Sequence, residues 1–169
     1  MSIVGLAGGG SGPIVVVSLA MLIPLCGTGT EYRACFSQAD SPGGVIEALA
    51  GHHGSATVAY DSWRDMSAAR ALRAAGFHVV EVRNSSVVLS EPALHVHQAL
   101  RDGRLTLHGH PVLIDHVGNM YLERRPDGRV CPVRLADGGP ILGGLALVMA
   151  MKLALDDERQ LHDVTGAPG

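Results

Sequence analysis

The stretch that decides the fold is residues 57–65, which read T-V-A-Y-D-S-W-R-D. An apolar and β-branched run at residues 56–60 predicts a short buried strand, and an Arg- and Ala-rich helical pattern follows at residues 64–75. Asp61 stands between the two, at the end of a strand, where α/β sheets bind ligands and metals. An Asp in this position also commonly caps the helix that follows. The local sequence therefore leaves a ligand-binding role and a capping role open for Asp61.

The sequence on both sides of this stretch predicts an α/β fold. Strands are predicted at residues 2–6, 13–23, 31–36, 56–60 and 77–82, and helices at 42–50, 64–75, 90–101 and 141–155. The glycine-rich loop at residues 8–12 is interpreted as a hairpin turn, because it lacks the Lys-Ser/Thr of a phosphate-binding loop. We expect a mixed five-stranded sheet with flanking helices and a late β-hairpin at residues 121–133.

One domain accounts for the length of 169 residues, with residues 1–155 forming the fold and residues 156–169 a polar C-terminal tail that frays. The final predicted helix is apolar almost all round, which predicts that it is buried. The formal charge of −3 argues against a strongly basic nucleic-acid-binding surface. The three cysteines are Cys26, Cys35 and Cys131, and their wide spacing favours a reducing cytoplasm. Residues 13–25 are too short to span a bilayer and lack a charged flank, so no membrane association is expected.

A series of motifs, in one order along the chain, points to a family. They are Y-D-S-W (60–63), V-V-E-V-R (79–83), D-G-R-L-T-L-H-G-H-P-V-L (102–113), H-V-G-N (116–119) and I-L-G-G-L-A-L-V-M-A (141–150). This series resembles the C-terminal nuclease domain of the large terminase subunit of tailed bacteriophages, the motor protein that cuts and packages DNA. The likeness covers residues 2–155 and implies a ribonuclease H-like fold.

The resemblance also implies a nuclease site in which acidic residues hold two divalent metals. The family places these acids on the first strand, at the end of the fourth strand and at the start of the last helix. Asp61 matches the second position, whereas Ala7 and Leu142 stand at the first and third. Glu81 matches a Glu that is common in the family and is a candidate second ligand. The expected cofactor is therefore none, or weakly held Mg²⁺ or Mn²⁺ at Asp61 and Glu81.

Three functions follow from this pattern. The first is a domain that has lost two-metal cleavage by natural change and acts as a binding or assembly module, with DNA or a phage packaging or capsid component as partner. The second is an active Mg²⁺/Mn²⁺-dependent packaging endonuclease that uses Asp61, Glu81 and a displaced acid such as Asp137. The third is a structural protein that forms homo-oligomers. The sequence has no Walker A lysine motif, so we expect any packaging motor to be a separate chain or part of a longer one.

Two further groups of side chains are candidates. His108, His110 and His116 have a spacing that could bind a transition metal, although surface or hydrogen-bonded histidines are the favoured interpretation. The candidates for a DNA-facing rim are Arg64, Arg83, Arg104, Asn119 and Arg134. Asn119 matches an Asn that is common in the terminase nuclease family, and Arg134 lies where that family has a Lys. For the arginines, a solvated, mixed-charge face is the favoured interpretation, because they are scattered among acids.

Overall fold

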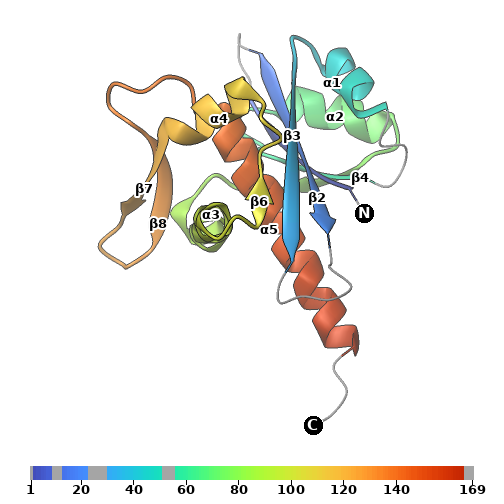
Figure 1. Ribbon diagram of the computed structural model, residues 1–169. Coiled ribbons are helices and arrows are strands. Elements are labelled where there is room, and N and C mark those ends of the chain that lie inside the picture. Colours follow the sequence, from blue (N-terminus) through green and yellow to red (C-terminus); the bar gives the residue numbers. More distant parts are fainter. Residues whose placement is uncertain (1, 9–12, 23–29, 51–55, 166–169) are drawn as a thin grey trace.

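The computed structural model describes residues 2–8, 13–22, 30–50 and 56–165 (Figure 1). Its main sheet has six strands in the order β5-β4-β1-β2-β3-β6, and a separate hairpin is formed by β7 and β8. The strands are β1 (Ser2–Ala7), β2 (Ile14–Leu22), β3 (Glu31–Ala39), β4 (Ala56–Tyr60), β5 (His78–Glu81), β6 (Leu105–Thr106), β7 (Met120–Arg124) and β8 (Val130–Arg134). The expected mixed sheet and late hairpin are confirmed, and the two-residue strand β6 is an addition to the five predicted strands.

The strand directions bring two chain segments to one rim of the sheet. β2 is antiparallel to β1 and to β3, whereas β4 is parallel to β1 and β5 is parallel to β4. The β1–β4 ladder pairs Gly5 with Ala59, so Ala7 and Asp61 lie two residues further along at the same end. Parallel neighbours that end together leave their last residues side by side.

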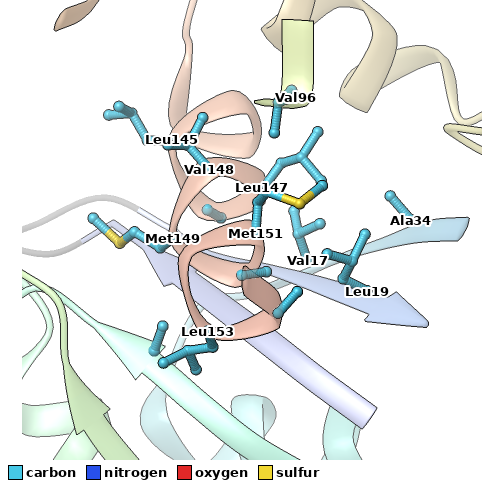
Figure 2. Close-up of a cluster of buried hydrophobic side chains, with 14 of the residues drawn as sticks. Val17, Leu19, Ala34, Val96, Leu145, Leu147, Val148, Met149, Met151 and Leu153 are labelled. Atoms are coloured by element: carbon cyan, nitrogen blue, oxygen red, sulfur yellow. The ribbon is translucent and has the colours of Figure 1, made fainter. Parts of the chain in front are cut away.

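The sheet is covered on both faces, as an interior strand pattern requires. Helices α1 (Pro42–Leu49) and α2 (Met66–Ala74) cover one face, and α3 (Ser86–Arg101) and α5 (Leu142–Thr165) cover the other. Side chains of β1 alternate between the two cores, with Ile3 and Ala7 facing α5 and Val4 and Leu6 facing α1 and α2. Figure 2 shows the apolar side chains of α5 packed against the strands.

Helix α5 can lie close to β1 because Gly5 has no side chain. A Cβ at Gly5 would stand 1.8 Å from the carbonyl oxygen of Ala146. At the start of the helix, a Cβ at Gly143 would stand 2.8 Å from Nδ1 of His116. The two glycines therefore fix how near α5 approaches the sheet and helix α4 (Pro111–Gly118).

Three boundaries differ from the predictions by three residues or more, and one helix was not predicted. Helix α3 begins at Ser86 rather than at residue 90, and helix α4 was not predicted. Strand β3 extends to Ala39, three residues past the predicted end at 36. Helix α5 continues to Thr165, so residues 156–165 are helical and the expectation of a frayed segment there is wrong. The reason is tertiary: the Tyr32 hydroxyl donates to Glu158 Oε1 at 2.9 Å, which holds the last turns against β3.

Several sequence expectations fall partly or wholly outside the described residues. They include most of the glycine-rich turn and Cys26. Cys35 and Cys131 are free thiols. No helix in the described ranges combines the length and the apolar character needed to cross a membrane.

Candidate functional site

The rim at which β1 and β4 end contains a small cavity. Ala7 and Gly8 from the end of β1, Asp61 from the end of β4 and Leu142 from the first turn of α5 line it together. Its volume is about 10 Å³, which is room for roughly one water molecule. The three chain segments expected to form the site do therefore meet at one place.

Asp61 is held in place by the turn that follows β4. The side chain is 5% exposed, and its Oδ1 accepts a hydrogen bond from the Trp63 backbone N–H at 3.2 Å. Its carbonyl oxygen accepts from the N–H of Arg64 at 3.1 Å and of Asp65 at 2.8 Å. Helix α2 begins at Met66 with Asp65 in the capping position, so Asp61 is not the N-cap residue of this helix.

Asp65 is a second carboxylate at this cavity, and it is not among the candidates predicted from the sequence. It is 1% exposed, and neither carboxylate oxygen has a hydrogen-bond partner. Burial raises its pKa from 3.8 to about 6; the Asp61 carboxylate acts in the same direction, while the Asp61 backbone and Arg64 oppose the shift. The signal in the sequence was the second Asp of D-S-W-R-D, which would ordinarily be interpreted as an exposed helix cap.

Most of the other walls are hydrocarbon, and Arg64 and Asn84 supply the rest of the polar lining. Ala7 is 4% exposed, and Leu142 packs against the core beneath α5. Leu145 and Met149, one and two turns further along the helix, also line the cavity. Alanine and leucine offer no lone pair to a hard cation, so the carboxylates at this rim come from one segment of five residues.

Glu81 does not line this cavity. It pairs with Tyr60 across the β4–β5 ladder, and Tyr60 faces the core under α1 and α2. Successive side chains of a strand point to opposite faces of the sheet. Asp61 therefore shares a face with Ala59, which faces α5, and its side chain is directed away from the face of Tyr60 and Glu81. Glu81 Oε1 instead accepts from the Ser62 hydroxyl at 2.8 Å and lies 3.6 Å from Nε of Arg83.

The family model for the terminase large subunit, endonuclease domain, matches residues 28–158. The chain belongs to this family. No curated protein sequence matches it.

Solved structures share the fold of this terminase nuclease-family domain at low identity. The HK97 bacteriophage large terminase aligns with a TM-score of 0.72 at 14% identity, over 90% of this chain and 38% of the HK97 chain. The large terminase nuclease of thermophilic phage G20c with bound magnesium gives 0.63 at 16%, over 89% and 80%. The nuclease domain of the bacteriophage SPP1 large terminase with bound Mn gives 0.58 at 14%, over 93% and 86%. The chain thus spans well under half of the HK97 protein.

The three candidate histidines of this terminase domain are in different environments. His108 is exposed, with a φ of 48°, and the His110 ring packs on Phe36 with ring centres 4.6 Å apart. Nδ1 of His116 accepts the Gly143 N–H at 2.9 Å, and burial lowers the pKa of His116 while Asp115 opposes the shift. Among the described residues, no group of three or more His, Cys, Asp or Glu side chains could hold a metal ion.

The DNA-facing candidates divide into three places. Arg64 lines the rim cavity, and the exposed Arg83 follows β5 nearby. Asn119 and Arg134 flank the hairpin where β7 begins and β8 ends, since Met120 pairs with Arg134. Arg104 lies at the opposite end of the sheet, where its backbone and side chain bond β3 and Thr30.

Trp63 is the most exposed large hydrophobic residue at the rim. Its side chain is 92% exposed, and its backbone N–H is bonded to Asp61. An indole this exposed buries little apolar surface, so it contributes little to the stability of the monomer. It is therefore available to a partner at the same rim.

Proposed function

We propose that this terminase nuclease-family domain has lost two-metal DNA cleavage and acts as a binding or assembly module in phage DNA packaging. The observation that carries the proposal is the apolar lining of the rim cavity, which includes Ala7 and Leu142. These are the two positions at which the resemblance implies acids. A pair of divalent ions about 4 Å apart needs several shared oxygen ligands. Asp61 and Asp65 alone, around a space of about 10 Å³, do not fit two ions.

The rim of this chain can be contrasted with solved nuclease domains that are described with bound metal. The solved nuclease domains of phages G20c and SPP1 are described with bound magnesium and bound Mn. This chain has the same fold, yet hydrocarbon occupies two sides of its rim. An intact fold whose rim has few oxygen ligands supports a binding role over a catalytic one.

The partner proposed for the rim is DNA, with a packaging component as the other choice. Arg64 and Arg83 lie near the exposed Trp63, and this combination of cations and an aromatic face suits nucleic acid. Asn119 and Arg134 form a second polar surface beside the start of α5, which could also contact DNA. The net charge of −3 restricts any such contact to this local patch.

Cleavage of supercoiled plasmid DNA tests the proposal directly. The purified chain should leave the plasmid intact with Mg²⁺ or Mn²⁺, whereas Ala7→Asp/Leu142→Asp, which returns acids to both places, should gain Mn²⁺-dependent nicking. Metal-dependent nicking by the unaltered chain that is abolished in Asp61→Ala would overturn it. An electrophoretic shift assay on the same protein measures whether DNA is bound without being cut.

Membership of an endonuclease family favours the rival, an active packaging endonuclease. It would need ligands beyond Asp61, and Glu81 and Asp137 were its candidates. Glu81 is engaged by Ser62, and Asp137 is not among the residues that line the cavity. The rival therefore requires a rearrangement of the rim, which the plasmid assay would reveal as cleavage.

The third hypothesis, a structural oligomer, was motivated by the apolar last helix. That helix buries Ala146, Leu147, Val148, Met149, Ala150 and Met151 inside one chain. Its apolar character is thus explained without a second copy. Homo-oligomerisation stays a prediction, to be measured by light scattering over a range of protein concentrations.

A further inference from the structure

We propose that Asp65 takes over from the acids missing at Ala7 and Leu142, and that Asp65 and Asp61 together hold a single divalent cation at the rim. The proposal rests on the proposed function, because it assumes that the two-ion arrangement is gone. It goes further by assigning a ligand, Asp65, and a stoichiometry of one ion per chain.

The side chain of Asp65 has no structural task in the described part of the chain. It sits in the N-cap position of α2, but its carboxylate makes no capping hydrogen bond. Only the backbone of Asp65 takes part in the helix, since its carbonyl accepts the first intrahelical hydrogen bond from Ala69 N–H at 2.9 Å. Both carboxylate oxygens are buried without a partner.

A buried carboxylate of this kind is costly unless a cation neutralises it. Arg64 also lines the cavity, but it donates no hydrogen bond to Asp65. The second carboxylate, Asp61, faces the same space and has one oxygen engaged by Trp63 N–H. Two carboxylates with free oxygens, enclosed on one side of a sheet rim, are an arrangement that a small cation would stabilise.

The donor set indicates the kind of cation. Asp61, Asp65 and the nearby amide of Asn84 offer oxygen atoms, which Mg²⁺ and Mn²⁺ prefer. The rest of the lining is Arg64, which is itself a cation, and apolar residues such as Leu142 and Leu145, so a second ion would have no ligands of its own. A volume of about 10 Å³ admits one partly dehydrated ion. Mn²⁺ is the better probe, because Mg²⁺ gives up its waters reluctantly.

The test combines metal counting with thermal unfolding of the full chain after treatment with a chelator. Electron paramagnetic resonance of added Mn²⁺ should show one bound ion per chain. At about 10 mM Mn²⁺, a site with a dissociation constant of about 1 mM raises Tm by about 3–6 °C. Asp65→Asn should abolish both signals while raising the Tm of the metal-free protein, because it removes a buried unpaired charge.

Glu47→Gln is the matched control, since Glu47 is an exposed acid on α1 far from the rim in sequence. It should leave the Mn²⁺ signal and the Tm shift unchanged. Asp61→Asn is the second variant at the site and should abolish binding as Asp65→Asn does. Retention of the Mn²⁺ shift in folded Asp65→Asn would overturn the proposal.

The same samples, assayed on plasmid DNA, separate this inference from the proposed function. One bound ion that depends on Asp65, with no cleavage, supports both. No bound ion and no cleavage overturns the cation site and leaves the loss of catalysis standing. One ion dependent on Asp65 together with cleavage supports the cation site and overturns the loss of catalysis. Two bound ions with cleavage overturns both.

Discussion

Asp61 and Asp65 are four residues apart and have different surroundings. The carboxylate of Asp61 receives a backbone N–H, whereas that of Asp65 receives no hydrogen bond. The side chain of Asp65 is also the more deeply buried of the two. Because burial disfavours the charged form, Asp65 holds a proton to a higher pH than an ordinary Asp does.

This pKa predicts a stability effect of Asp65→Asn. Between its ordinary pKa of 3.8 and its folded-state pKa of about 6, the folded protein binds more protons than the unfolded chain. The protein therefore loses stability from Asp65 as pH rises through this window, and the loss is complete above about pH 6. With a chelator present, Asp65→Asn should raise the free energy of unfolding by up to about 3 kcal/mol at pH 7.5.

Urea unfolding at pH 7.5 and at pH 4 measures this effect. The increase in the free energy of unfolding caused by Asp65→Asn should be large at pH 7.5 and small at pH 4. An equal advantage at both pH values would show that charge burial is not its cause.

His116 predicts the opposite pH trend. Its neutral Nδ1 accepts the Gly143 N–H, and its pKa is lowered by burial. The unfolded chain therefore binds more protons near the ordinary His pKa of 6.5, so this contribution is present above pH 6.5 and is lost as pH falls below it. His116→Asn keeps an acceptor but does not titrate, so wild type should lose stability relative to this variant between pH 7.5 and pH 5.5.

The exposed His97 provides the control for this comparison. His97→Asn should change with pH as the wild type does. If the difference between wild type and His116→Asn is the same at both pH values, the neutral acceptor role of His116 is refuted.

At the scale of elements, Gly5 allows β1 and α5 to pack closely together. Gly5→Ala would place a Cβ 1.8 Å from the carbonyl oxygen of Ala146, so the helix must move away from the sheet. We expect a loss of about 3 kcal/mol or more in the free energy of unfolding, because backbone has to shift in a packed core. Chemical denaturation measures it.

Gly43 is the matched control for Gly5. It lies in α1, and the nearest atom to an added Cβ is Ser41 Oγ at 3.8 Å. Gly43→Ala should therefore raise stability by up to about 1 kcal/mol through helix propensity. Similar losses in both variants would mean that the contact with Ala146 is not what requires glycine at residue 5.

The elements that were predicted correctly are those whose local sequence has a clear hydrophobic pattern. Strands β1, β2 and β4 are apolar and β-branched runs, and α5 is apolar enough to require burial. Helix α4 was missed because P-V-L-I is short and contains as much strand as helix preference. Helix α3 begins early despite Pro92, which is buried within it and would by itself suggest a break.

The site was predictable in part for the same reason. Asp61 at the end of a strand is visible in the sequence, and the family resemblance identified Ala7 and Leu142, which the structure brings to the same cavity. Asp65 could not be found, because its burial depends on how α5 covers the rim. Glu81 lies at the end of β5, beside the end of β4, but the alternation along these strands directs its side chain to the other face.

For the molecule as a whole, α5 connects the two ends of the sheet (Figure 1). Leu142 lies at the rim, and Glu158 reaches Tyr32 at the opposite end, where β3 begins. The Tyr32 hydroxyl also lies 3.2 Å from Nε2 of His95 on α3. The last turns of α5 thus join the helix layer to the sheet.

Truncation after Leu155 tests the domain boundary predicted at that residue. Loss of the Glu158 acceptor for a buried hydroxyl should lower the free energy of unfolding by about 1–2 kcal/mol. In a Tyr32→Phe background the truncation should cost less, because the shared hydrogen bond is already gone. Unchanged stability after truncation would instead support a domain that ends at residue 155.

The chain contains one tryptophan, and it is Trp63. Because its indole is almost fully in water beside Asp61, the intrinsic fluorescence of this protein reports on a single point of its surface. Any molecule that covers the rim will shift or quench that emission, whereas one that docks at the far end of the sheet will leave it unchanged. The native protein thus carries its own optical probe, and no label is needed to learn where a partner sits.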